Sequence, residues 1–276
     1  MGLRINTNVS SLNTQRHLQN STINFGKSME KLSSGLRINR AGDDAAGLAI
    51  SEGLKSEIRA LNQAARNAAD GISMIQTAEG SLDEVSNIML RMKELAEQSL
   101  NGTLSNTDRG YLDAEYTALK AEIDRISEAS EFNGKSLLNG TSGVVIIQVG
   151  TGTAASDQVS LDMSNDMDTG AGNLNLQAGI DTVSEATSSM GEIDSAIETV
   201  VGVRGDFGAI QNRLETSIRN INMTSENLSA ANSRIRDVDV AYETSRMTSF
   251  QILQQAGISI LAQANMIPGL AMSLLG

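Results

Sequence analysis

Apolar residues recur along most of the 276-residue chain at intervals of three and four positions, a spacing that places them on one face of an α-helix. One such seam consists of Ile72, Ile75, Leu82, Val85, Met89, Met92 and Leu95. The next consists of Leu112, Tyr116, Leu119, Ile123 and Ile126. The last consists of Ile193, Ile197, Val200, Val203, Phe207, Ile210, Leu214, Ile221, Leu228, Ile235 and Tyr242. The C-terminal half must fold back on the N-terminal half to bring these seams together. The pattern therefore predicts a mainly α protein, a long antiparallel helical bundle or coiled coil formed by the N- and C-terminal halves.

The two ends of the chain carry different patterns. Ile5, Val9 and Leu12 precede a polar stretch over 13–20, and an isolated arm of this kind is only marginally helical, so we expect it to pair with residues 238–275. Residues 247–276 contain no charged side chain, yet Gln, Asn and Pro interrupt the apolar residues. A membrane span needs about 20 predominantly apolar residues, so this tail is predicted to pack against protein instead of lipid. Its assembly surface would include Ile252, Leu253, Ile260, Leu261, Leu270, Leu274 and Leu275.

The middle of the chain reads as a small β region. Residues 144–149 form a β-branched run bounded by glycines, and Val159, Leu161 and Met163 alternate with polar residues, which predicts two strands. Leu174 and Leu176 suggest a further strand. The acids here, Asp157, Asp162, Asp166 and Asp168, lack the ligand order of a calcium loop and are interpreted as a solvated face.

Composition narrows the function further. The chain has no cysteine, one histidine and a net charge of −12, which argues against disulfides, histidine-based catalytic or metal sites and nucleic-acid binding. Gly150-Thr151-Gly152 lacks the glycine and helix of a phosphate loop, and no nucleophile has a base placed for it. We expect no enzyme activity, no cofactor and no metal. No hydrophobic signal peptide is visible, which predicts a cytosolic protein or one exported by a non-standard route.

Four stretches make the chain resemble bacterial flagellin. They are MGLRINTNVSSLNTQRHL at 1–18, LSSGLRINRAGDDAAGLAI at 32–50, RNAADGISMIQTAEGSLDEVSNIMLRMKELAEQ at 66–98 and ILQQAGISILAQAN at 252–265. The resemblance implies a structural subunit that polymerises into the extracellular flagellar filament for swimming motility. It also implies export through the flagellar type III apparatus without a cleaved signal peptide. In the family, paired terminal helices line the inner tube, a helical bundle with a β-hairpin forms the next shell, and variable outer domains are inserted in the middle.

The resemblance gives a layout with a short insertion in place of outer domains. The N-terminal half would consist of an inner-core helix (1–34), a connector (35–44) and the first part of the outer-core bundle (45–138). A short central β/loop insertion (139–179) would follow. The C-terminal half would consist of the second part of the bundle (180–235) and a C-terminal inner-core helix (236–276). The terminal helices would drive assembly through Ile5, Val9 and Leu12 together with the tail residues named above.

The resemblance also implies partners. Arg91, Leu95 and Glu115 lie in segments similar to the helical surface read by Toll-like receptor 5, which overlaps a protofilament contact. The tail from Val238 is similar to the part that an export chaperone holds before secretion. The filament cap and hook-associated proteins are the remaining expected partners, besides other copies of the chain.

Two alternatives belong beside this interpretation. A hook–filament junction protein shares related terminal helices, but the long matches at 32–50 and 252–265 favour flagellin. A secreted membrane-inserting translocator would need residues 247–276 to enter a bilayer, which the glutamines oppose.

Overall fold

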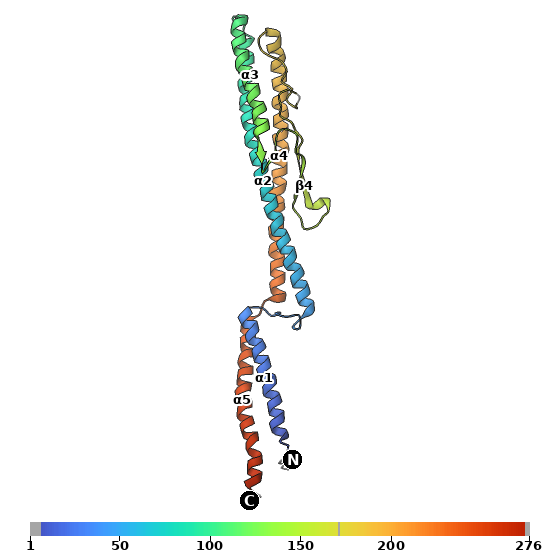
Figure 1. The fold of residues 1–276 in the computed structure, drawn as a ribbon, viewed down its shortest axis with the longest axis vertical. Coiled ribbons are helices and arrows are strands. Elements are labelled where there is room, and N and C mark those ends of the chain that lie inside the picture. The colour runs from blue at the N-terminus through green and yellow to red at the C-terminus, as the bar shows by residue number, and fades with distance from the viewer. Residues whose placement is uncertain (1–6, 171, 274–276) are drawn as a thin grey trace. The chain divides into compact units, whose positions relative to one another are not determined.

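A computed structural model describes residues 7–170 and 172–273, with side chains described as far as Met266. The chain is mainly helical, as the apolar spacing predicts, and it also contains two small antiparallel hairpins (Figure 1). The helices are α1 (Val9–Ser34), α2 (Ala45–Ser99), α3 (Asn106–Ala129), α4 (Val183–Arg236) and α5 (Val240–Ser273). The strands are β1 (Glu131–Phe132), β2 (Lys135–Ser136), β3 (Gly143–Gln148) and β4 (Gln158–Met163), with a 3-10 turn at Ala155–Asp157.

Contacts divide the chain into two compact units. One combines the residues up to Ser56 with those from Asn227 onward, and the other is Glu57–Glu226. One boundary falls inside α2, 12 residues after the expected end of the connector at residue 44 (56 − 44). The other falls inside α4, nine residues before the expected end of the bundle at residue 235 (235 − 226). We call these the terminal unit and the bundle unit.

The bundle unit is held by one apolar core between α2, α3 and α4. The seams predicted from the sequence supply it: the members of the first two, and those of the third from Ile193 to Leu214, are buried or half-buried on the facing sides of the three helices. The largest fully buried side chains of this core include Tyr116, Phe207, Ile75, Leu82, Met89, Met92, Leu95 and Ile123.

The turn between α2 and α3 is built on a buried arginine. Arg109 donates to the carbonyl oxygens of Ser99 (2.8 Å) and Asn101 (3.1 Å) and to Asn106 Oδ1 (3.0 Å). These bonds satisfy carbonyl groups that the end of α2 leaves without helical partners. The turn is therefore fixed by a charge whose donors are largely satisfied.

The β region packs on the helices of the bundle unit. Asn133 and Gly134 adopt positive φ (51° and 74°), as a two-residue hairpin between β1 and β2 requires. β3 pairs with β4 from Gly143↔Met163 to Gln148↔Gln158, so the expected two-stranded hairpin is confirmed. A Cβ at Gly71 of α2 would lie 2.5 Å from Ile147 Cδ1, so the missing side chain lets β3 approach α2 closely.

Two expectations about regular structure are wrong. Leu174 and Leu176 form no strand in the described part of the chain; they are buried in the core as part of an irregular segment. The third seam does not run on to Tyr242, because α4 ends at Arg236 and α5 begins afresh at Val240. Tyr242 is 64% exposed.

The terminal unit contains the antiparallel pair α1 and α5 and the connector between α1 and α2. Asp44 caps the start of α2, since its Oδ1 accepts from the Gly47 N–H (2.8 Å). The neighbouring Asp43 accepts from the N–H groups of Arg40 (3.1 Å) and Asn39 (3.2 Å), and the Arg40 bond chiefly lowers the pKa of this carboxyl. Asp44 therefore fixes the start of α2, and Asp43 fixes the turn of the connector before it.

Tyr116 gives a stability prediction for the bundle core. Within residues 7–170 and 172–273 its hydroxyl makes no well-formed hydrogen bond, since the nearby Ser189 hydroxyl already donates to the Gly179 carbonyl oxygen; burial raises the pKa of the phenol, and Ser189 only partly opposes that rise. An unsatisfied buried hydroxyl costs about 1–3 kcal/mol, so Tyr116→Phe is expected to raise the free energy of unfolding by about 1 kcal/mol. Urea unfolding followed by circular dichroism measures this. A loss of stability would show that the hydroxyl has a partner after all.

Candidate functional site

We first consider metal sites and membrane spans among the described residues. No group of three or more acids or histidines within them could hold a metal ion. Among the same residues, no helix is both long enough and apolar enough to span a bilayer.

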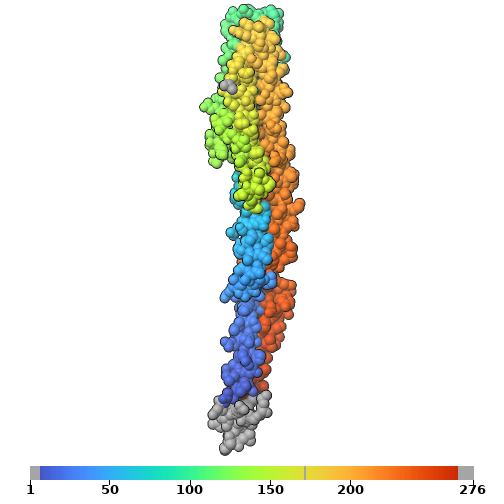
Figure 2. All heavy atoms as spheres, turned by 90° about the vertical axis from the view of Figure 1, so that its right-hand side faces the viewer, coloured from blue at the N-terminus to red at the C-terminus, as the bar shows by residue number. Residues whose placement is uncertain are grey.

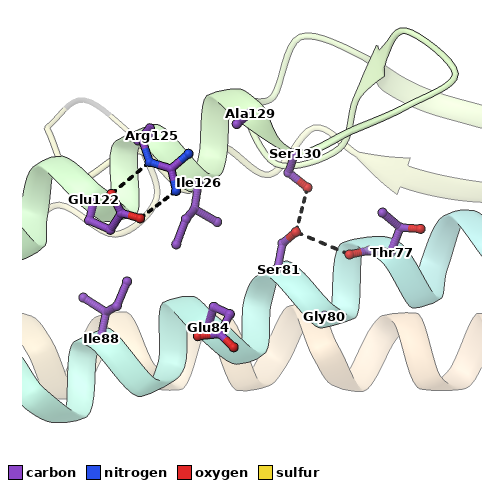
Figure 3. A pocket seen from close by; sticks show the side chains of 10 residues that line it. All are labelled: Thr77, Gly80, Ser81, Glu84, Ile88, Glu122, Arg125, Ile126, Ala129 and Ser130. Atoms are coloured by element: carbon purple, nitrogen blue, oxygen red, sulfur yellow. Dashed lines mark hydrogen bonds and ion pairs between the residues drawn. The ribbon is translucent and has the colours of Figure 1, made fainter.

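A groove of ≈ 540 Å³ runs between α2 and α3 (Figure 3). Glu122 and Arg125 form an ion pair on its α3 side (2.6 Å), which lowers the pKa of Glu122. At the C-terminal end of α3, Ser130 Oγ donates across the groove to Ser81 Oγ of α2 (3.0 Å), and Ser81 Oγ donates to the Thr77 carbonyl oxygen (3.4 Å). The polar groups of the groove thus bond to one another, as in an ordinary seam between helices.

The contact between α1 and α5 is unusual because its buried positions are small or polar. Ser11 and Ser28 on α1 and Glu243 and Ala264 on α5 are the buried residues of the described part of this pair. A typical helix pair buries a stripe of large apolar side chains instead.

Large apolar side chains cover the outside of the same pair, whose long flanks are seen in Figure 2. They are between 50% and 66% exposed: Val9, Leu12, Ile23, Met29, Ile252, Leu253, Ile258, Ile260 and Met266. At 100° per residue, Ile252, Leu253 and Ile258 point in three different directions from α5. A helix that is apolar on all sides is normally buried. In the single chain, however, these side chains of α5 remain exposed.

These positions can be compared with the assembly residues expected from the sequence. Val9, Leu12, Ile252, Leu253 and Ile260 are exposed on the terminal unit, and Leu261 is half-buried. Leu270 lies in α5, but its side chain is outside the described residues, as are Ile5, Leu274 and Leu275 altogether. Sequence reasoning missed the exposed Ile23 and Met29 of α1.

The second predicted surface centres on Arg91 of α2. Its guanidinium donates to Glu115 Oε1 of α3 (2.9 Å) and to Glu94 Oε2 (2.9 Å), and these bonds raise the pKa of Arg91. Arg91 and Glu115 are about half exposed, so the structure brings them together on the surface.

Leu95 does not join them. It is 1% exposed and belongs to the bundle core, so its expected place on the receptor surface is wrong for this structure. The reason is the helical seam itself, because Leu95 follows Met92 by three residues and points inward with it.

Comparisons with known proteins agree on one family. The bacterial flagellin N-terminal helical region matches residues 5–143, and the bacterial flagellin C-terminal helical region matches residues 190–275. A flagellin from Halalkalibacterium halodurans is 47% identical over 98% of this chain and 99% of its own length. The crystal structure of Bacillus cereus flagellin, 33% identical, covers 60% of this chain and 94% of its own with a TM-score of 0.51. A hook-associated protein from Vibrio parahaemolyticus, 18% identical with a TM-score of 0.60, shares the fold.

Proposed function

This chain belongs to the bacterial flagellin family and is a structural subunit of the flagellar filament outside the cell, and we propose that the apolar faces of α1 and α5 hold its subunits together. The observation that carries the proposal is the exposure of large aliphatic side chains around a helix pair whose few fully buried positions are small or polar. A soluble monomer rarely leaves a large contiguous apolar surface in water. Polymerisation would cover it with the same surface of neighbouring copies.

The energetics favour this assignment. Fully burying an aliphatic side chain contributes about 1.5–3 kcal/mol, and the exposed Val, Leu and Ile of this pair have about half of that still to gain. Six such residues, Val9, Leu12, Ile252, Leu253, Ile258 and Ile260, would therefore gain about 5–9 kcal/mol per subunit before ordering costs. A gross gain of that size is a large contribution to a polymer contact, because every 1.4 kcal/mol is a factor of about ten in affinity.

Cysteine labelling tests the proposal directly, because the chain contains no cysteine of its own. Leu12→Cys and Ile252→Cys are expected to react with a maleimide in free subunits and to be protected in filaments. Thr153→Cys, in the exposed loop between β3 and β4, is the matched control and should react in both states. Equal labelling of Ile252→Cys in subunits and filaments would contradict the proposal.

The same faces suggest the partners of the free subunit. An export chaperone would cover α5 before polymerisation, which fits export without a cleaved signal peptide. The filament cap and the hook-associated proteins would meet the same surfaces at the two ends of the filament. Pull-down of the chaperone with Ile252→Ser in α5 would test the first of these contacts, and unchanged capture would count against it.

Receptor recognition would use the Arg91–Glu115 surface. Its support is the exposed ion pair between α2 and α3, and Leu95 would then act by supporting α2 from inside the core. An Arg91→Gln variant that activates Toll-like receptor 5 as strongly as the parent protein would refute this part.

The layout of the chain follows the same division. The terminal helices with their connector would form the inner core of the filament, α2 to α4 the outer core, and residues 139–179 the short segment in the position of the outer domains.

A further inference from the structure

Polar side chains link α1 and α5 at several levels. Ser28 Oγ donates to Glu243 Oε1 (2.5 Å), and Ser11 Oγ donates to Asn265 Oδ1 (2.8 Å). Asn8 Nδ2 also donates to the carbonyl oxygen of Ala264 (2.7 Å). We call the Ser28–Glu243 and the Ser11–Asn265 hydrogen bonds two rungs between the helices. They are about 25 Å apart along α1, at a rise of 1.5 Å per residue.

Among these residues, Glu243 depends most on its hydrogen-bond partners. Its side chain is only 5% exposed, and besides Ser28 it has Arg246 Nη1 at 3.8 Å from its second carboxylate oxygen. An ionised carboxylate is costly to bury and becomes more so when a partner is taken away. Its place beside Ser28 is therefore strongly preferred over a place beside an apolar residue.

Apolar contacts alone would align these helices poorly. Ile and Leu side chains occur around α5 in every direction, and aliphatic contacts are non-directional, so many axial positions would bury similar areas. A buried polar residue is the established means by which helix pairs select one register at some cost in stability.

We propose that the Ser28–Glu243 rung, together with the Ser11–Asn265 rung, fixes the axial register of α1 against α5. This inference rests on the proposed role of the two helices in the filament, because the register decides which apolar side chains lie level on the outside of the pair. The polar contacts choose the alignment, and the apolar faces then join subunits.

The Ser11–Asn265 contact excludes a slip that the Ser28–Glu243 contact alone would permit. A slip of seven residues in one direction would bring Glu243 opposite Ser21, another serine, but would place Ser11 opposite Ile258. A slip of seven in the other direction would carry Glu243 to Gly35, beyond the end of α1. The Ser28–Glu243 rung alone would leave the first of these slips open.

Engineered disulfides report the register. A Cβ at Gly257 would lie 3.7 Å from Leu18 Cβ, within the range of about 3.5–4.5 Å that disulfides occupy. Leu18→Cys with Gly257→Cys is therefore the reporter of the observed register. Leu18→Cys with Phe250→Cys and Leu18→Cys with Ala264→Cys report the two seven-residue slips, because each moves the second cysteine about 10 Å along α5.

The experiment compares Glu243→Leu with the parent chain in each reporter. Reporter subunits are polymerised together with an excess of cysteine-free full-length subunits and then oxidised. On non-reducing gels, a disulfide between α1 and α5 of one subunit changes the migration of that subunit. Filaments are pelleted by centrifugation, and the disulfide products of the subunits that remain in the supernatant are measured on the same gels. Glu243→Leu is expected to lower the ratio of observed-register to slipped-register product by about tenfold, equivalent to about 1.4 kcal/mol.

Matched variants separate register from general damage. Glu243→Gln retains an acceptor for Ser28 and is expected to keep the parent pattern, whereas Ser28→Ala is expected to shift it toward slipped products. Glu226→Leu, the same change at an exposed position of α4, should have no effect. A parent-like pattern for Glu243→Leu in pellet and supernatant would overturn the register proposal even if filaments form normally. Loss of protection of Ile252 in filaments would instead refute the proposed function.

Discussion

Filaments are expected to disappear when Ile252 and Ile260 of α5 are both replaced by serine. Each side chain is more than half exposed in the single chain, so about half of the usual 1.5–3 kcal/mol of aliphatic burial remains for assembly. Losing both removes about 1.5–3 kcal/mol per subunit, and every 1.4 kcal/mol is a factor of ten in affinity. The concentration needed for polymerisation should therefore rise about tenfold to a hundredfold.

Sedimentation of polymerised protein over a concentration series measures this change. The matched control replaces both residues by leucine, which keeps the apolar area and alters only its shape, and should pellet almost as the parent does. Circular dichroism of the free subunits checks that the serine variant retains its helices. Normal pelleting of the serine variant would mean that α5 does not carry the assembly contact.

The bundle unit was largely predictable, because its seams obey the helical spacing on which sequence reasoning relies. Met89, Met92 and Tyr116 fall on predicted seams and are buried in the structure. The spacing works there because one chain supplies both sides of the core. Local contacts and global fold then agree.

The terminal unit was predicted only in outline. The pairing of α1 with α5 was expected from their weak independent stability, but spacing rules assume that apolar residues face the nearest helix of the same chain. Here Ser28 and Glu243 face it, while Leu12 and Ile252 face outward. The sequence does hold a signal for this arrangement, since Glu243 is the last acid of the chain before a long uncharged segment.

The break between α4 and α5 could also have been found. Ile221, Leu228, Ile235 and Tyr242 recur every seven residues, which favoured one continuous helix. Asp239 stands three residues before Tyr242, however, and its Oδ1 accepts from the Tyr242 N–H (3.1 Å) as a helix cap does. A heptad spacing alone does not outweigh such a start signal.

Leu95 shows how a resemblance and a physical pattern can disagree. The resemblance assigned it to a recognition surface beside Arg91, whereas the apolar spacing assigned it to a helical seam. Its burial in the core agrees with the seam. A role in recognition would therefore have to be indirect, through the position of α2.

The effect of Leu95→Ala on stability decides between these roles. Truncating a leucine in a packed core costs about 2–5 kcal/mol, because burial is lost and a cavity remains. We expect a loss of this size in urea unfolding of free subunits, below the concentration at which they polymerise. Leu90→Ala is the matched control, since Leu90 lies on the same helix and is 54% exposed.

Both substitutions change helix propensity equally, so the difference between them isolates burial. Leu90→Ala should stay within about 0.5 kcal/mol of the parent, as surface substitutions usually do. If Leu95→Ala were equally mild, the side chain would be dispensable to the core and free to face a partner. If it is severe, weakened receptor activation by a Leu95 variant reflects a disturbed bundle, and only Arg91 and Glu115 variants of normal stability can map the surface.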